Sequence, residues 1–252
     1  MSVEFKPVPA VYKCFGIIEL FVVAQKPLGI SAIAAALGYH RSTVFNLTYS
    51  LVDLGILERG NDGKFLLGER FNELGKTAGR HSGLVHTARP YLEQINTETG
   101  LTAFLGVQSA LNAVVVDKAD SVAGLKVSTE VGHSLSLLVG AGGKALLSQL
   151  PDEELDGILA ATDLIQFTPL SCVDKNEFKN IILKVREEGI AVDMEEYAVG
   201  VRALAVPLHV SRNIPTAIWA VGLKWRLPDE RIFSVATLLK QIAKKIEQKM
   251  AD

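Results

Sequence analysis

Hydrogen-bonding side chains are concentrated in one short stretch, RSTVFNLTYSLVDL, at residues 41–54. Four apolar residues in it recur at helical spacing and predict one buried stripe, formed by Val44, Leu47, Leu51 and Leu54. Five side chains fall off this stripe and should face outward, namely Ser42, Thr43, Phe45, Asn46 and Tyr49, and Arg41 stands at the start of the stretch. Amides and hydroxyls on such a face can bond to base edges, and arginine can contact phosphates. We therefore expect a helix that reads DNA, although a helical hairpin buried in another core would show the same pattern.

The residues before this stretch predict the supports that such a helix needs. Residues 31–37 form another short helical pattern, with Ser31 as its N-cap and Gly38 at the left-handed position that ends a helix. Residues 12–23 are mostly apolar and predict a first, supporting helix. Two short helices joined by a tight turn make a helix-turn-helix motif.

A hairpin pattern follows the second of these helices. Two short runs, 56–59 and 64–67, enclose a turn that contains Asp62-Gly63, which is a strong local hairpin signal. A hairpin at this point would form a wing, with Arg59 and Lys64 placed to meet phosphate oxygens. The N-terminal region is therefore expected to be a winged helix-turn-helix domain.

Composition and charge limit the classes of protein that fit. Of the 252 residues 48% are hydrophobic and 21% charged, with a net charge of −2, which is typical of a globular protein and argues against one that coats nucleic acid nonspecifically. Residues 1–80 carry nine Lys/Arg and seven Asp/Glu, hence +2, and residues 81–252 carry −4. Two distant cysteines, no secretory signal and no apolar run of about 18 residues favour a cytoplasmic location without a membrane anchor.

The rest of the chain alternates between strand and helix patterns. Helices are expected at 85–99, 142–150, 152–159, 175–188 and 229–250, and strands at 103–108, 113–118, 125–130, 191–197, 203–210 and 216–224. Residues 69–83 are polar and helix-compatible, which suits a linker helix. Antiparallel strands flanked by helices indicate an α+β domain.

A glycine-rich turn, residues 140–144, is the strongest candidate for ligand chemistry in that domain. It lacks the spacing and the Ser or Thr of a phosphate-binding loop. With a helix starting near Gly142, small residues would instead let a carboxylate approach free backbone N–H groups. A turn that needs glycine for packing alone is the alternative.

Acidic, histidine and tryptophan residues give no enzyme signature. A regular strand over 191–197 would put Asp193 and Glu195 on one face and Glu196 on the other, and a solvated or structural role fits them. No zinc or nucleophile motif is present, so we expect no catalytic residue, no metal and no cofactor. Trp219 and Trp225 should pack the last strand against helices.

Four blocks give the chain a resemblance to the IclR family of bacterial transcriptional regulators, namely RSTVFNLTYSLVDLGILERGNDGKFLLG, GAGGKALLSQLPDEEL, VREEGIAVDMEEYAVGVRALAVPL and the long C-terminal helix. The resemblance implies a winged helix-turn-helix domain over 1–68, a linker helix over 69–83 and a GAF-like effector-binding domain over 84–252. It implies a homodimer or a dimer of dimers that binds a double-stranded operator, acts as a repressor and responds to a small organic or aromatic acid.

The resemblance also places the effector pocket. This pocket should have low polarity, because the chain departs from the residues that are usual in the family. Asparagine at 46 replaces a usual arginine, and the last pocket strand lacks hydroxyls. The expected effector-binding residues are Val127, Leu135, Ala141, Gly142, Gly143, Asp193, Val201, Ala203, Ala220 and Gly222. The alternative from another class is a cytosolic hydrolase or transferase acting on carboxylates, with the winged unit as a protein-interaction module.

Overall fold

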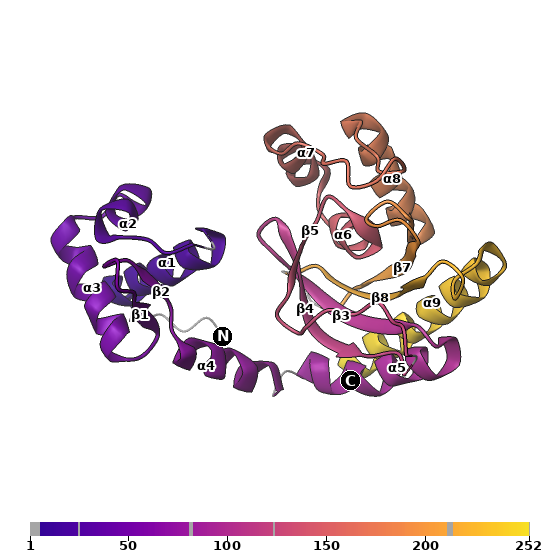
Figure 1. The fold of residues 1–252 in the computed structure, drawn as a ribbon, viewed down its shortest axis with the longest axis horizontal. Helices are drawn as coiled ribbons and strands as arrows, with labels where there is room; N and C mark the ends of the chain where they lie inside the picture. Colours follow the sequence, from indigo (N-terminus) through magenta and orange to yellow (C-terminus); the bar gives the residue numbers. More distant parts are fainter. Residues whose placement is uncertain (1–5, 25, 81–82, 123, 211–213, 252) are drawn as a thin grey trace. The chain divides into compact units, whose positions relative to one another are not determined.

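The computed structural model describes residues 6–24, 26–80, 83–122, 124–210 and 214–251 (Figure 1). The chain divides into two compact units, residues 1–80 and 81–252. Each unit has its own buried core, so each is described separately below.

The N-terminal unit is built from helices and a small hairpin. In order these are α1 (Pro9–Ala24), α2 (Ile30–Leu37), α3 (Arg41–Asp53), β1 (Leu57–Arg59), β2 (Phe65–Leu67) and α4 (Glu69–Arg80). Their apolar faces meet in one core that contains Ile17, Phe21, Ile33, Ala34, Val44, Leu51, Leu57 and Phe65. The predicted helix-turn-helix and hairpin are therefore present.

Two details of this unit differ from the sequence prediction. The N-cap of α2 is Gly29, with no side-chain cap, so Ser31 lies inside the first turn instead. The helix α3 ends at Asp53, so Leu54 is 50% exposed rather than part of the buried stripe, and Thr48 is buried in its place. Gly38 does end α2 in the left-handed conformation, at φ 67°.

The hairpin is closed by its turn residues. The N–H of Gly60 donates to Lys64 O at 2.8 Å, and the N–H of Lys64 donates to Asp62 Oδ1 at 3.0 Å. Gly63 has φ 76°, a conformation that favours glycine. The strands are antiparallel, with Leu57 opposite Leu67.

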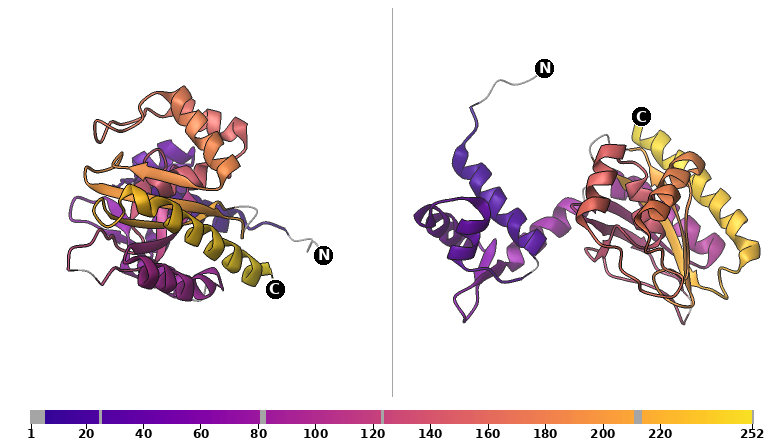
Figure 2. Two further views of the ribbon diagram at one scale, coloured as in Figure 1. Left: turned by 90° about the vertical axis from the view of Figure 1, so that its right-hand side faces the viewer. Right: turned by 90° about the horizontal axis from the view of Figure 1, so that it is seen from above.

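The C-terminal unit is an antiparallel six-stranded sheet with the order β5-β4-β3-β8-β7-β6. The strands are β3 (Thr102–Ser109), β4 (Asn112–Ala119), β5 (Ser134–Ser136), β6 (Ala191–Met194), β7 (Val201–Leu208) and β8 (Thr216–Leu223). The helices α5 (Gly83–Thr99) and α9 (Asp229–Ala251) pack side by side on one face (Figures 1 and 2). The other face carries α6 (Gly140–Leu147), α7 (Asp152–Ala161) and α8 (Lys175–Glu188).

The unit is the expected α+β arrangement, with three corrections. The predicted strand over 125–130 is not a strand, and β5 occurs a few residues later. The helix expected from Gly142 begins at Gly140. The strand expected over 191–197 ends at Met194, because Glu195 has φ 72° and turns the backbone out of the extended conformation.

Candidate nucleic-acid interface and ligand cavity

The outer face of α3 carries the predicted DNA-reading residues. Arg41, Ser42, Phe45 and Asn46 are exposed, and Thr43 and Tyr49 are half-buried. The Tyr49 ring lies between that of Phe45, at 4.5 Å between centroids, and that of Phe65 in the hairpin, at 5.7 Å. Asn46 is exposed and lines the same surface hollow as Tyr49.

Charged residues of the hairpin are only partly available to a partner. The Lys64 ammonium lies 3.3 Å from Asp62 Oδ2, and the backbone bond from Lys64 holds the pKa of Asp62 below its usual value. The Arg59 guanidinium lies over the Tyr49 ring at 5.8 Å, which connects the wing to α3. Both cations remain exposed, as a phosphate contact requires.

Two bonds that the sequence pattern did not reveal tie the ends of these elements together. Arg70 Nη1 donates to Leu54 O at 3.0 Å, where α3 ends. Glu58 Oε1 accepts the N–H of Glu69 at 3.0 Å, at the start of α4. Arg70 and Glu58 thus satisfy backbone groups that helix ends leave unpaired.

The C-terminal unit contains a cavity of about 250 Å³ between the sheet and α6. Eight of the ten residues predicted for the effector pocket line it: Val127, Leu135, Ala141, Gly142, Gly143, Asp193, Val201 and Ala203. The other lining residues include Phe104, Ser128, Thr129, His133, Tyr197, Trp219 and Val221. The lining comes from segments that are far apart in the sequence, so the fold assembles it.

The assignment of Ala220 and Gly222 to this cavity is wrong. Antiparallel register places Phe104 opposite Trp219, and Ala203 opposite Val221, so Trp219 and Val221 face α6. Ala220 is instead buried toward α5 and α9. Gly222 faces the same way, because an added Cβ would lie 2.4 Å from Leu101 Cδ2.

Trp219 packs the sheet against α6, as expected, and it also forms a wall of the cavity. It is 5% exposed and stacks on Phe104, with 5.6 Å between ring centroids and 28° between planes. Alternation along β8 separates its side chains into two faces. The sequence of this one strand does not show which of the two faces lines the cavity. Trp225, by contrast, is 62% exposed.

The glycine turn is shaped by close contacts at the start of α6. A Cβ on Gly143 would lie 2.2 Å from Leu137 O, so this position needs glycine for packing. A Cβ on Gly142 would lie 3.2 Å from the Trp219 ring and would narrow the cavity. Helix first turns leave backbone N–H groups without a helical partner, and those of α6 begin beside the cavity.

An acidic side chain stands next to that helix start. Asp193 is 3% exposed, and its Oδ1 accepts the N–H of Glu196 at 2.7 Å. Its Oδ2 lies on the side of Gly140, 3.5 Å from where a Cβ on that glycine would be. Burial raises the pKa of Asp193, and the nearby Glu196 charge adds to this effect.

A buried ion pair that the sequence did not predict lies behind Asp193. Lys144, 1% exposed, places its Nζ 2.5 Å and 2.6 Å from the two carboxylate oxygens of Glu196 and 3.0 Å from Val192 O. Glu196 therefore points inward, and Glu195 pairs instead with Lys224 at 2.7 Å. The prediction that Asp193 and Glu195 share one strand face is wrong, because β6 ends at Met194, before Glu195.

The turn after β6 is also held from the loop between α7 and α8. The Thr168 hydroxyl donates to Glu195 O at 2.8 Å, and the Ser171 hydroxyl donates to Glu196 O at 2.7 Å. The loop thus fixes the backbone that carries Tyr197 at the cavity.

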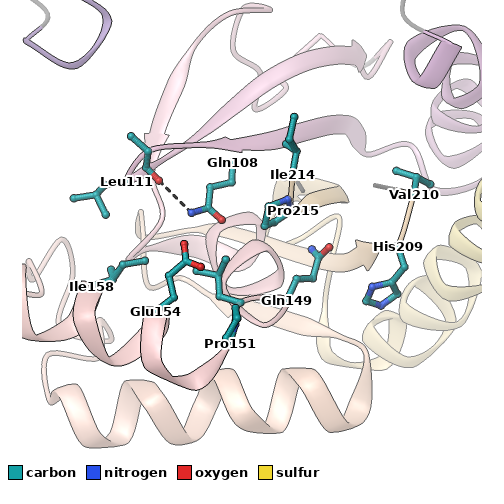
Figure 3. A pocket seen from close by; sticks show the side chains of 12 residues that line it. Gln108, Leu111, Gln149, Pro151, Glu154, Ile158, His209, Val210, Ile214 and Pro215 are labelled. Carbon is teal, nitrogen blue, oxygen red and sulfur yellow. Dashed lines mark hydrogen bonds between the residues drawn. The ribbon is translucent and has the colours of Figure 1, made fainter. Parts of the chain in front are cut away.

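A second, larger hollow of about 1040 Å³ lies near the β3–β4 turn and the start of α7 (Figure 3). None of the predicted site residues lines it. Gln149 Nε2 donates to Ala145 O and Thr216 O, and Gln108 Nε2 donates to Ala110 O, whereas Gln108 Oε1 is buried and has no hydrogen-bond partner among the described residues. The cavity beside α6 is the stronger candidate for a ligand site, because it is the more apolar of the two and is lined by eight of the predicted residues.

Over the described residues there is no group of three or more His, Cys, Asp or Glu side chains that could hold a metal ion. Among the helices in those same ranges, none is long and apolar enough to cross a membrane.

A winged helix-turn-helix unit followed by an α+β domain with a ligand-sized cavity defines the class of helix-turn-helix transcriptional regulators. Residues 10–60 match the IclR helix-turn-helix domain, and residues 77–248 match the bacterial transcriptional regulator IclR C-terminal domain. The chain belongs to the IclR family and is a DNA-binding transcriptional regulator.

Relatives and solved structures agree with this assignment over nearly the whole chain. The chain is 27% identical to the regulator XynR of Escherichia coli over 93% of this chain and 94% of that protein. It is 26% identical to KdgR of the same organism, over 96% and 93%. A putative transcriptional regulator from Rhodococcus sp. RHA1 has a TM-score of 0.68 at 26% identity, covering 97% of this chain and 99% of that one.

An IclR homologue from Microbacterium hydrocarbonoxydans, complexed with 4-hydroxybenzoate, has a TM-score of 0.67 at 21% identity, over 96% of this chain and 99% of that chain. At this identity the likeness concerns the fold.

Proposed function

We propose that this regulator is a repressor whose operator binding is controlled by a small organic or aromatic acid held in the cavity beside α6. The observation that carries the proposal is the largely apolar cavity into which the start of a helix opens. Aromatic and aliphatic side chains offer a surface for the body of a ligand, and backbone N–H groups at the helix start attract a carboxylate.

The lining favours an aromatic acid among the candidates. Trp219 and Phe104 form a stacked pair at the wall, and Val221 and Ala203 add apolar surface without a hydroxyl. Offset stacking on an aromatic side chain contributes about 0.5–1.5 kcal/mol beyond buried area. The homologue complexed with 4-hydroxybenzoate shows that an aromatic acid is compatible with this fold.

On the DNA side, we propose that α3 enters the major groove with Thr43, Phe45, Asn46 and Tyr49 toward the bases. Arg41, Arg59 and Lys64 would meet phosphates, with Ser42 as a further polar contact. The exposure of Arg41, Ser42, Phe45 and Asn46 supports this assignment. The partners are then a double-stranded operator in the cytoplasm, a small acid and further copies of the chain.

The alternative, a carboxylate-processing hydrolase or transferase, has less support. The Ser128 hydroxyl at the cavity donates to the Asp120 carboxylate and not to His133. Asp193 receives a backbone N–H and Glu196 is paired with Lys144. Among the described lining residues, no hydroxyl is hydrogen-bonded to a histidine, the arrangement that commonly activates a serine for covalent catalysis. Turnover of carboxylate esters that depends on Asp193 would favour the enzyme.

The direct test fills the cavity without touching the DNA face. Ala203→Leu should abolish binding of a panel of aromatic and aliphatic acids in calorimetry, while operator affinity without ligand stays unchanged. Ala161→Leu, at an exposed position at the end of α7, is the matched control and should bind as the native protein does. Equal binding by Ala203→Leu and the native protein would reject the cavity as the effector site.

A further inference from the structure

The cavity presents a carboxylate where the proposed effector would bring another. Of the lining residues that the structure describes, Asp193 is the one acid, and neither lysine nor arginine is among them. An acid placed at the start of α6 would therefore meet Asp193 with no lysine or arginine in the described lining to neutralise both groups. Two carboxylates in one buried site do not both ionise readily.

The nearest lysine is already committed. Among the described residues, the Lys144 ammonium bonds to the two carboxylate oxygens of Glu196 and to Val192 O, at 2.5–3.0 Å. Moving Lys144 toward the ligand would leave Glu196, whose side chain is 18% exposed, without its partner. Breaking a buried pair in this way costs on the order of several kcal/mol, so Lys144 stays with Glu196.

Asp193 presents one oxygen toward the helix start. Its Oδ1 accepts the N–H of Glu196, and the backbone N–H of Tyr197 also bonds to this carboxylate, while Oδ2 lies on the side of Gly140. A carboxylic acid could accept an N–H of the α6 first turn with one oxygen and share a proton with Asp193 Oδ2 through the other. The N–H of the α6 first turn would then face an acceptor oxygen of the ligand. Asp193 Oδ2 would face the ligand oxygen that shares the proton.

Resting on the proposed function, we propose that acid binding in this cavity is coupled to the uptake of one proton, held between the effector carboxylate and Asp193 Oδ2. The proton comes from solvent and no covalent bond changes. The recognised species is thus a weak monocarboxylic acid together with its proton, and a neutral primary amide can replace it. Burial of Asp193 acts in the same direction, since it raises the pKa of that carboxyl.

Other titratable groups near Asp193 must be separated from it. The helix α6 contributes Lys144, and the turn after β6 contributes Glu196 and Tyr197. The loop before β5 contributes His133, which lines the cavity. Cys172 lies near Glu196 and Lys144, and burial raises the pKa of its thiol. Of these, His133 is exposed and also lines the cavity, so the test includes a variant of it.

The test measures proton uptake directly. Calorimetry of the full chain with benzoate and aliphatic monocarboxylates, each beside its primary amide, is run in two buffers of different ionisation enthalpy at one pH. Above the pKa of Asp193 in the free protein, we expect uptake of about one proton per acid and about tenfold weaker binding per pH unit. The amides should bind without proton uptake and without this pH dependence.

Variants assign the proton to Asp193. Asp193→Asn keeps an oxygen for the Glu196 N–H and should bind acids with no proton uptake, while His133→Gln should keep an uptake near one whatever its affinity. Acids that bind the native protein without proton uptake would overturn this inference and leave the proposed function standing. If no acid binds at any pH, the acid effector of the proposed function fails, and this inference fails with it.

Discussion

At the scale of single residues, Trp219 decides the character of the cavity. The prediction placed the small residues Ala220 and Gly222 at the wall of the cavity. The structure has the large aromatic side chain of Trp219 there instead. The sequence showed correctly that Trp219 and Ala220 lie on opposite faces of one strand, because side chains alternate. Which face meets α6 depends on the register with β3 and β7, and residues distant in sequence set that register.

The two tryptophans provide a test of this placement. Trp219 lines the cavity, whereas Trp225 lies outside with the Arg226 guanidinium 4.5 Å above its ring. An aromatic acid should change the fluorescence of native protein saturably, and Trp225→Phe should keep this signal. Trp219→Phe should lose it and bind about two- to tenfold more weakly, since stacking is reduced. A signal that follows Trp225 would contradict the placement.

Asn46 is the residue with the most direct bearing on DNA sequence. Its amide can make two hydrogen bonds to adenine in the major groove. Asn46→Ala should relax discrimination at one base pair by about 1–3 kcal/mol, as measured by competition between operator variants. Asn72→Ala, at an exposed position of α4, is the matched control and should leave base preferences intact.

Lys64→Ala separates base reading from phosphate contact. It should weaken all sequences alike and reduce the salt slope of binding by about one unit. If Asn46→Ala leaves every base preference unchanged, α3 is not the reading helix.

At the scale of elements, local patterns predicted most helices and the hairpin, because caps and apolar spacing act within a few residues. The helix over 175–188, with Asp174 accepting the N–H of Glu177 and Gly189 at φ 67°, has the predicted bounds. The short strand β5 could not be predicted in the same way. It has three residues and exists through pairing with β4.

The contact between α6 and the turn after β6 likewise depends on tertiary structure. Lys144 and Glu196 are 52 residues apart in sequence, and neither position alone indicates a buried charge. Their pairing joins the helix that opens at the cavity to the turn that carries Tyr197. The pair therefore holds two walls of the cavity in place.

A double-mutant cycle can measure this contribution. Lys144→Met and Glu196→Gln should each lower the free energy of unfolding on the order of 3 kcal/mol, because each leaves a mostly buried group without its partner. The double variant should cost about 1–3 kcal/mol less than the sum, as measured by denaturant unfolding. Lys184→Met, which removes an exposed pair with Glu188 at 3.7 Å, is the control and should cost about 0.5 kcal/mol or less. Additive losses for Lys144 and Glu196 would argue against the pair.

At the scale of the whole molecule, two compact units share one chain, and each has its own core. The N-terminal unit keeps large apolar side chains on its surface, including Phe15 on α1, 59% exposed, and Leu74 on α4, 53% exposed. A net-negative chain with few basic contacts gains affinity when two reading helices bind two half-sites. We therefore expect these apolar residues to join copies of the chain on the DNA side, with half-buried Phe71 among them.

Charge substitutions test this assembly. Phe15→Glu together with Leu74→Glu should give monomers at micromolar concentration in sedimentation, because like charges would meet across a two-fold interface. Operator affinity should fall by about 100-fold or more, since the second half-site no longer adds to the first. Phe233→Glu, on α9 and 82% exposed, should change neither property. Native protein that sediments only as a monomer and binds its operator one to one would contradict the prediction, because a single copy would then supply all of the affinity.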